Sequence, residues 1–339
     1  MGALINLNGI NKIYYNGVEI KIAYANDSVV YQNDGIDRTY NHFVFDTSEI
    51  TESAPVTITL ANYRAGDETE WDGLTDWGDG TIDKELSHTY NTKGVYTVKT
   101  KWMINNRVDS KTYFADSNTI KTFVACNNVN RRITDVTYLF YYCTSLKSVD
   151  MSNFRTKNIT NMEAMFYNCI ALEELNMSGW NTSKVTSMRE MFSNCKRLTP
   201  KVSHFNVSNV YDFNCMFSHC GAIDGSQFKN WRISTTVSAI DMSYIFCGAT
   251  ITTNCLDISN WNMSKVTSLF DAFYKCCVYE GIDISGWNIR DNCNTSWMFK
   301  EVYCRTCTRK NPHYTERHVD HVGVPVDDWF KIEYHKQQL

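Results

Sequence analysis

The sequence has none of the short motifs that mark the common hydrolases and nucleotide-dependent enzymes. It contains no Gly-x-Ser-x-Gly, no glycine-rich phosphate loop and no His-Glu-x-x-His. Those motifs build a nucleophile turn, a phosphate cradle and a zinc protease site. The histidines of the central region, His204 and His219, have no nucleophile or carboxylate partner at a catalytic spacing. We therefore expect a protein that is not an enzyme and has no cofactor.

The sequence also has a small net charge and no long apolar run. Lys and Arg total 33 against 37 Asp and Glu, and no basic stripe occurs, which argues against nucleic acid as a partner. No segment approaches the roughly 18 apolar residues of a membrane span. The start, residues 1–5, lacks the basic and long apolar regions of a signal peptide, and Asn6 breaks the myristoylation pattern. We expect no membrane insertion and no export by these routes.

A repeated phrase dominates the second half of the chain. A run ending in Met-Phe-x-x-Cys, or a variant of it, returns about every 26 residues between about residue 137 and residue 300. A second aromatic residue keeps the same period. A fixed period of this size indicates a solenoid, in which each unit buries its apolar face against its neighbours. The repeated phenylalanines are Phe140, Phe166, Phe192, Phe217, Phe246, Phe273 and Phe299, and the second aromatics are Phe154, Trp180, Phe205, Trp231, Trp261 and Trp287.

Within each unit the pattern predicts a short strand and then a short helix. In the unit 146–169, apolar residues first alternate with polar ones, as in a strand with one buried face. Thr160 then stands three residues before Glu163, the spacing of a capping box. The next apolar residues recur at helical spacing. We expect an α/β leucine-rich-repeat solenoid over residues 116–303. The residues at helical spacing are Met162, Met165, Phe166 and Cys169.

The repeated phrase resembles a known family. Its form, LxxLxMSxW/FNTSxVTxMxxMFxxC, is similar to the 26-residue repeat of the BspA-like leucine-rich-repeat family, which occurs in bacterial surface proteins and some phage proteins. The resemblance covers about 180 of 339 residues. Two units depart from it, because Ala249 and Val302 stand where the cysteine is expected. Membership implies adhesion or scaffolding and brings no catalytic residue.

The chain has thirteen cysteines, which in a short secreted protein would indicate disulfides. Five of them occupy one equivalent position in successive repeats, so we expect a buried column of small reduced thiols. Disulfides between neighbours would need the ends of the predicted helices to approach more closely than helix stacking permits. Reduced thiols suit a chain that folds in a reducing cytoplasm. The five are Cys143, Cys169, Cys195, Cys220 and Cys276.

A separate group of cysteines and histidines follows the last repeat. Cys304, Cys307, His313 and His318 have the residue types and gaps of a compact zinc knuckle. The alternative is that Cys304 belongs to the core of the last repeat and the histidines face solvent. We take the structural interpretation as the expectation and predict no metal.

Residues 38–115 resemble a PKD domain, an immunoglobulin-like β-sandwich. The resemblance rests on the sequence DWGDGT at 76–81, SHTY at 87–90 and GVYTV at 94–98. The glycines permit a tight turn, and the last segment alternates as a strand does.

Three aspartates of this region raise the question of a calcium site. Asp76, Asp79 and Asp83 lie close together in the sequence, and carboxylates are calcium ligands. Aspartates in turns more commonly accept hydrogen bonds from backbone amides. We expect the second role.

The two ends of the chain are expected to attach and to cap. Residues 10–31 read as strands around Asn16-Gly17, a hairpin turn signal, with a third strand further on. This segment is similar to a short β segment of phage tail and baseplate proteins, so residues 1–35 are expected to dock to other virion proteins. Residues 304–339 are expected to cap the solenoid or to dock to a partner.

The expected fold class is therefore mixed: a small N-terminal β unit, an immunoglobulin-like sandwich, and an α/β leucine-rich-repeat solenoid with a C-terminal cap. With no export signal, these resemblances favour a bacteriophage virion protein of the tail, baseplate, fibre or head decoration, oligomeric in the particle. The alternative is a BspA-like adhesin at the bacterial cell surface. In either case a strand face of mixed chemistry is expected to touch a host glycan or protein. Its candidate residues are Lys147, Asp150, Glu173, Glu174, Asn176 and Lys201, with Ser148, Asp257 and Asp283.

Overall fold

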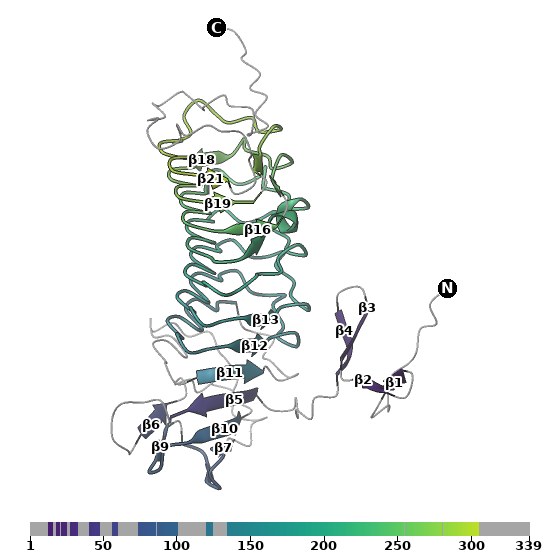
Figure 1. Cartoon of the computed structure of the whole chain (residues 1–339), viewed down its shortest axis with the longest axis vertical. Helices are drawn as coiled ribbons and strands as arrows, with labels where there is room; N and C mark the ends of the chain where they lie inside the picture. The colour runs from purple at the N-terminus through teal and green to yellow at the C-terminus, as the bar shows by residue number, and fades with distance from the viewer. Residues whose placement is uncertain are drawn as a thin grey trace.

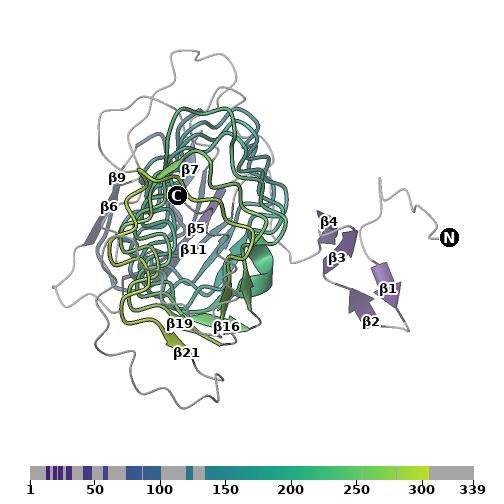
Figure 2. The same ribbon diagram turned by 90° about the horizontal axis from the view of Figure 1, so that it is seen from above.

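The second half of the chain is a β-solenoid, whose coils stack into a rod (Figure 1). Each coil is one repeat of about 26 residues, and the coils superpose into one flattened ring when the rod is seen from above (Figure 2). The computed structural model describes residues 13–15, 18–20, 22–25, 28–32, 41–47, 56–59, 74–85, 87–100, 120–124, 134–253, 255–279 and 281–304.

The N-terminal strands form two hairpins, which Figure 1 shows beside the rod. In the first hairpin Ile13 lies opposite Ile20 and Tyr15 opposite Val18, so the predicted pairing of the two strands is confirmed, while Asn16-Gly17 lie outside the described residues. The sequence predicted three strands in this segment, and the structure has four. They are β1 (Ile13–Tyr15), β2 (Val18–Ile20), β3 (Ile22–Ala25) and β4 (Ser28–Gln32).

A seven-stranded sheet joins the middle of the chain to the rod. Its order is β13-β12-β11-β5-β10-β7-β8. β11 is the junction, because it pairs antiparallel with β5 on one side and parallel with β12 on the other. The first edge of the solenoid is thereby covered by paired strands. The strands are β5 (Asn41–Asp46), β7 (Thr75–Asp76), β8 (Ile82–Asp83), β10 (Val95–Thr100), β11 (Ile120–Val124), β12 (Ser148–Asp150) and β13 (Glu174–Asn176), and β6 (Val56–Thr59) pairs separately with β9 (Ser87–Tyr90).

The remaining strands are short and pair in parallel from one coil to the next. They fall on two sides of the ring and are joined by isolated bridges. Among the described residues, the one helix is the short 3-10 helix η2 (Gly225–Phe228). The parallel pairs are β14 (Ile223–Asp224) with β16 (Ile251–Thr253), β15 (Ile240–Asp241) with β18 (Val266–Ser268), β17 (Leu256–Asp257) with β20 (Ile282–Asp283), and β19 (Cys277–Val278) with β21 (Tyr303–Cys304).

The helix predicted in each repeat is wrong: that run forms two consecutive β-turns. The Met165 amide donates to the Met162 carbonyl, and the Cys169 amide donates to the Phe166 carbonyl. The third residue of each turn has a positive φ, +49° at Ala164 and equally left-handed values elsewhere, as type II turns require. Two four-residue turns bury apolar side chains at the same spacing as a helix, which is why the pattern predicted one.

The predicted capping box is wrong for the same reason. The Glu163 amide donates to Asn161 Oδ1 at 3.0 Å, so the residue after Thr160 holds the turn. The Thr160 hydroxyl instead donates to the Thr134 carbonyl of the preceding coil at 3.1 Å. Alternate amides of the run donate to carbonyls of the following coil, as Phe166 does to Met191 at 3.0 Å. On this side of the rod, the hydrogen bonds of the alternate amides therefore link each coil to the next.

The core consists of ladders of equivalent side chains, as the repeat predicted. The rings of the phenylalanine ladder, from Phe140 to Phe299, stack with centroids 5.1–5.9 Å apart and within 19° of parallel. In the second aromatic column, indole N–H groups donate to carbonyls of the preceding coil, as Trp231 does to Val202 at 2.9 Å. One continuous apolar cluster extends from β5 to the last coil.

The predicted column of reduced, buried thiols is confirmed for the described cysteines. Among the ten cysteines whose side chains the structure describes there is no disulfide, and the five repeat cysteines are buried. Cys169 Sγ donates to the Phe140 carbonyl at 3.0 Å and Cys195 Sγ to Phe166 at 3.1 Å. Burial raises the pKa of both thiols, which keeps them protonated and unreactive.

Candidate binding surfaces

The predicted strand face lies on the first two strands of the rod. β12 and β13 pair in register, with Ser148 opposite Glu174 and Asp150 opposite Asn176. Lys147, directly before β12, is exposed. The structure thus brings five of the six predicted positions together, on two neighbouring strands or directly before them. The sixth, Lys201, is exposed in the next coil, where no strand forms.

Some polar residues of the strand face have a structural role. The Ser152 amide donates to Asp150 Oδ1 at 3.0 Å, and the Ser178 amide donates to Asn176 Oδ1 at 3.2 Å. Such bonds hold the turn that ends each strand. Asp257 and Asp283 accept equivalent amide bonds in later coils.

One exposed carboxylate of the strand face is in an ion pair. Arg197 donates to Glu173 Oε1 at 2.8 Å, and both side chains are more than half exposed. A pair in that setting contributes little to stability. Arg197 was not among the predicted residues, although it lies 24 positions after Glu173, close to one repeat away. Lys147, Glu174 and Lys201 remain as exposed charges of this face.

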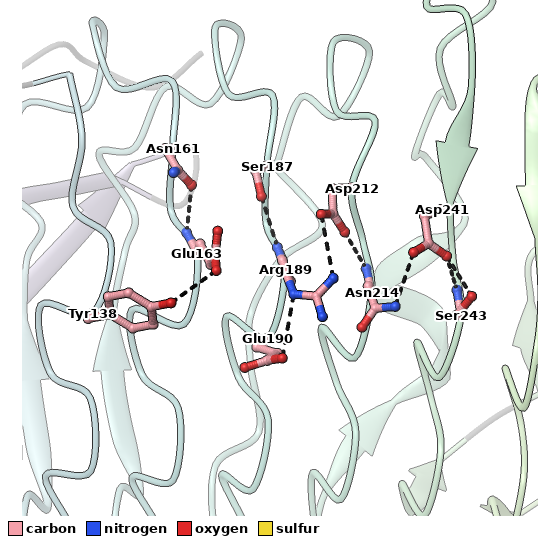
Figure 3. Close-up of polar contacts among 10 residues, drawn as sticks. All are labelled: Tyr138, Asn161, Glu163, Ser187, Arg189, Glu190, Asp212, Asn214, Asp241 and Ser243. Carbon is pink, nitrogen blue, oxygen red and sulfur yellow. Dashed lines mark hydrogen bonds and ion pairs between the residues drawn. The ribbon is translucent and has the colours of Figure 1, made fainter. Parts of the chain in front are cut away.

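A second surface, the turn face, is formed by the paired β-turns of the coils. Its spine is a polar ladder in which a side chain just before each turn accepts the amide two residues on (Figure 3). Asp212 Oδ1 accepts from Asn214 at 3.0 Å, and Asp241 Oδ1 accepts from Ser243 at 2.8 Å. The signal in the sequence is a short polar residue before the first buried residue of the run. The ladder comprises Asp135, Asn161, Ser187, Asp212, Asp241, Ser268 and Asn294.

Carboxylates crowd the centre of the turn face. Arg189 lies 3.5 Å from Glu190 and 3.9 Å from Asp212, so one guanidinium serves two carboxylates (Figure 3). Partial burial raises the pKa of both acids, and neighbouring Glu163 adds to this, although Arg189 opposes it. The Tyr138 hydroxyl donates to Glu163 Oε1 at 3.1 Å. Most of these polar side chains therefore have a hydrogen-bond or ion-pair partner within the same group.

Aromatic side chains flank this polar centre. Toward the N-terminal end, Tyr141 stacks on Tyr167 at 5.0 Å and meets Tyr138 edge to face at 5.2 Å. Tyr142 belongs to the same group and is 37% exposed. Sequence reasoning assigned most aromatic residues to core positions and missed this group. The available signal was that these tyrosines fall outside the two repeating aromatic positions.

A further aromatic group lies on the turn face of the last coils. Tyr244, Phe270 and Trp297 form a row across three successive coils, with centroids 5.3 and 5.8 Å apart. Lys300 Nζ lies 4.7 Å from the centre of the Trp297 ring, and Lys275 Nζ lies near Tyr274. Cation–π contacts thus cover part of this group.

The two groups of residues considered as metal sites, the aspartates at 76–83 and the cysteine–histidine group after the last repeat, have different outcomes. Asp76, Asp79 and Asp83 each accept a backbone amide two residues on, at 2.9–3.0 Å, so their predicted role in turns is confirmed. Asp79 Oδ2 also lies 2.7 Å from His88 Nε2. The other cluster, Cys307, His313 and His318 with the side chain of Cys304, lies outside the described residues. Within the described part of the chain, no group of three or more potential ligands gathers.

The structure describes only part of the two ends of the chain. The 304–339 tail, predicted as a cap or docking segment, lies outside the described residues apart from Cys304 in β21. Among the residues described, no helix has the length and apolar character to span a membrane.

Comparison with known proteins gives one result. The chain matches the family described as "Mycoplasma protein of unknown function, DUF285" over residues 134–250 and again over 225–311. The two matches together cover just over half of the chain and coincide with the described coils. Neither the curated proteins nor the solved structures give a match.

Proposed function

Since this chain belongs to the family described as Mycoplasma protein of unknown function, DUF285, we propose that it is a non-enzymatic surface repeat protein. In this proposal it is an adhesin of the BspA-like type that displays its rod to other cells. The family match covers the same repeats that resemble BspA-like proteins. It favours the adhesin over the virion protein, because the description names cellular proteins.

The observation that carries the proposal is a closed core beneath an exposed aromatic surface. The ladders bury nearly all of the repeated apolar residues, so the coils need no partner to complete their core. Large aromatic side chains nevertheless lie exposed on the rod, among them Tyr142 and Trp297. Exposed aromatic residues are enriched where proteins bind partners.

The N-terminal elements support a role in attachment. Two-stranded hairpins are marginally stable alone, and their open edges are suited to pairing with a strand of another protein. In the adhesin, β1–β4 would join the chain to the cell envelope or to further copies. The strands from β5 to β10 would act as a PKD-like spacer between that attachment and the rod.

A bacteriophage virion protein is the second candidate, and it rests on the resemblance of the β1–β4 segment to phage tail and baseplate proteins. The two candidates differ in where the protein is found. Antibody labelling of intact, unlysed cells that produce the protein should stain their surface if the adhesin is correct. A protein that is absent from the surface and present in purified particles, detected by mass spectrometry, would establish the virion role instead.

Adhesion itself is tested with the full chain coupled to beads at high density. Binding to host cells is expected to be weak for single molecules and strong for many copies together. Reversing the charges of the strand face, with Glu173→Lys and Glu174→Lys, should weaken it without changing the melting temperature. Glu85→Lys, an exposed position in the N-terminal sheet, is the matched control. Beads that bind no cells at any density would refute the adhesin.

A further inference from the structure

One carboxylate oxygen of the turn face has no hydrogen-bond partner. Asp271 is only 6% exposed, and its Oδ1 atom is the one buried polar side-chain atom of the described residues without a hydrogen bond. Desolvation raises the pKa of this group, although Lys300 opposes the shift. Buried polar atoms are nearly always satisfied in folded proteins, and an exception needs an explanation.

Backbone conformation alone does not explain the residue. Asp271 has φ +52°, and aspartate and asparagine tolerate this left-handed region better than most residues. The equivalent positions, however, hold side chains as different as Ala164, Glu190 and Cys215. An asparagine would meet the same conformational need without an unpaired charge. The carboxylate is therefore not needed for the turn.

The surroundings of Asp271 point to a ligand that carries hydroxyl groups. The aromatic row of Tyr244, Phe270 and Trp297 runs past it along the rod, and Trp297 is 46% exposed. Lys275 and Lys300 lie at the same end. These ammonium groups repel a cationic ligand, and the Asp271 carboxylate repels an anionic one. The remaining class is a neutral ligand that donates hydrogen bonds.

We infer that Asp271 and the aromatic row of Tyr244, Phe270 and Trp297 form a binding site for a neutral sugar of a cell-surface glycan. A pyranose ring presents C–H groups that pack on an exposed indole, and its hydroxyls donate to a carboxylate. A ring that stacks on the face of Trp297 now covered by Lys300 would displace that ammonium and open the way to Asp271. The inference rests on the proposed adhesin, for which it names the ligand class and the site.

The test uses the full chain and a defined set of sugars. Saturation-transfer NMR would be recorded with the methyl glycosides of glucose, galactose, mannose and N-acetylglucosamine. A lysine-rich peptide and a heparin disaccharide would serve as charged probes. We expect transfer to the ring protons of at least one neutral sugar. Trp297→Ala should abolish it, and Asp271→Asn should weaken binding at least about tenfold.

Two matched variants control for surface and charge. Tyr211→Ala removes an aromatic residue of similar exposure (48%) elsewhere on the rod, and Glu190→Gln neutralises a carboxylate at the equivalent position of another coil. Both should bind sugar normally. Asp271→Asn should melt at the same or a higher temperature, because it removes a desolvated charge.

Several results would overturn the site. These are no transfer to any of the neutral sugars, transfer that Asp271→Asn leaves unchanged, binding of the charged probes alone, or a lower melting temperature for Asp271→Asn. Failure of the site is separable from failure of the adhesin. Beads that bind cells while the protein binds no sugar would refute the site alone, and sugar binding without cell binding would refute the adhesin alone.

Discussion

Truncation of one ring of the phenylalanine ladder tests whether the coils share one core. Phe192 is fully buried, and its ring lies between Phe166, at 5.9 Å, and Phe217, at 5.7 Å. The change Phe192→Ala removes contacts with the coils on both sides. In a solenoid each unit depends on its neighbours, so the loss should destabilise three coils together.

The magnitude follows from burial and stacking. Truncation of a buried phenylalanine costs roughly 3–5 kcal/mol, depending on how far the cavity collapses. Stacked aromatic pairs contribute about 0.5–1.5 kcal/mol each, and the loss of two such pairs places the cost in the upper part of the range for a buried phenylalanine. Because the neighbouring rings are themselves held in the ladder, little collapse is available. We expect a loss of about 4–5 kcal/mol.

Equilibrium unfolding in urea, followed by circular dichroism, measures this loss. Phe192→Leu keeps most of the buried carbon and should cost only about 1–2 kcal/mol. The control Lys147→Ala, at an exposed position of the strand face, should cost less than about 0.5 kcal/mol. Hydrogen exchange should show faster exchange in the coils of Phe166 and Phe217. A cost below about 1 kcal/mol for Phe192→Ala would refute a shared core.

Three further predictions concern other parts of the chain. Without reductant, thiol titration of the unfolded protein should find nearly all thirteen cysteines free, while the folded protein reacts slowly because burial raises the pKa of the ladder thiols; few free thiols after unfolding would contradict the ladder. Gly78→Ala should destabilise the N-terminal sheet more than Gly80→Ala: both have positive φ, but a Cβ at Gly78 would lie 2.6 Å from the Thr97 carbonyl and one at Gly80 would meet nothing, so equal melting temperatures would refute the steric argument. Since the pKa values of Glu190 and Asp212 are raised in the folded chain, the stability they contribute is present at low pH and lost as pH rises above their ordinary values of 4.5 and 3.8. The double variant Glu190→Gln with Asp212→Asn should therefore lose less stability than the parent as pH rises above those values, measured by urea unfolding, and parallel profiles would show that these groups do not titrate as described.

The sequence predicted the period and the core of the solenoid, because both depend on which residues are apolar. Phe140, Phe166 and their equivalents recur at one position per coil, and the structure stacks them. Strands at 148–150 and 174–176 follow the predicted alternation.

The conformation between the strands could not be predicted from the same pattern. Consecutive β-turns and a helix bury residues at the same spacing, so Met162, Met165 and Cys169 fit both. The distinguishing feature is the direction of alternate amides, which donate to the next coil here, whereas in a helix they would donate within the run. Asn161 carried a usable signal, since its side chain begins the turn, but Thr160 and Glu163 matched a capping box and were preferred.

The candidate surfaces were predicted only where exposure follows from alternation. Lys147 and Glu173 are exposed as expected. The aromatic groups of the turn face were missed because their positions follow no apolar period. No property of the repeat that contains Asp271 indicates that its Oδ1 atom is buried without a hydrogen bond.

The backbone bonds that link coils lie along the rod, and this direction determines how the protein responds to mechanical tension. Strand pairs such as β12 and β13 stack along the rod, so their hydrogen bonds run close to the direction of a pull on its two ends. Such bonds are loaded one coil after another, and the rod should open stepwise from an end. Each 26-residue coil that opens adds up to about 90 Å of extended chain in place of a rise of about 5 Å. In the proposed adhesin, a cell held by the rod would move far from its anchor point before the attachment itself bears the full load.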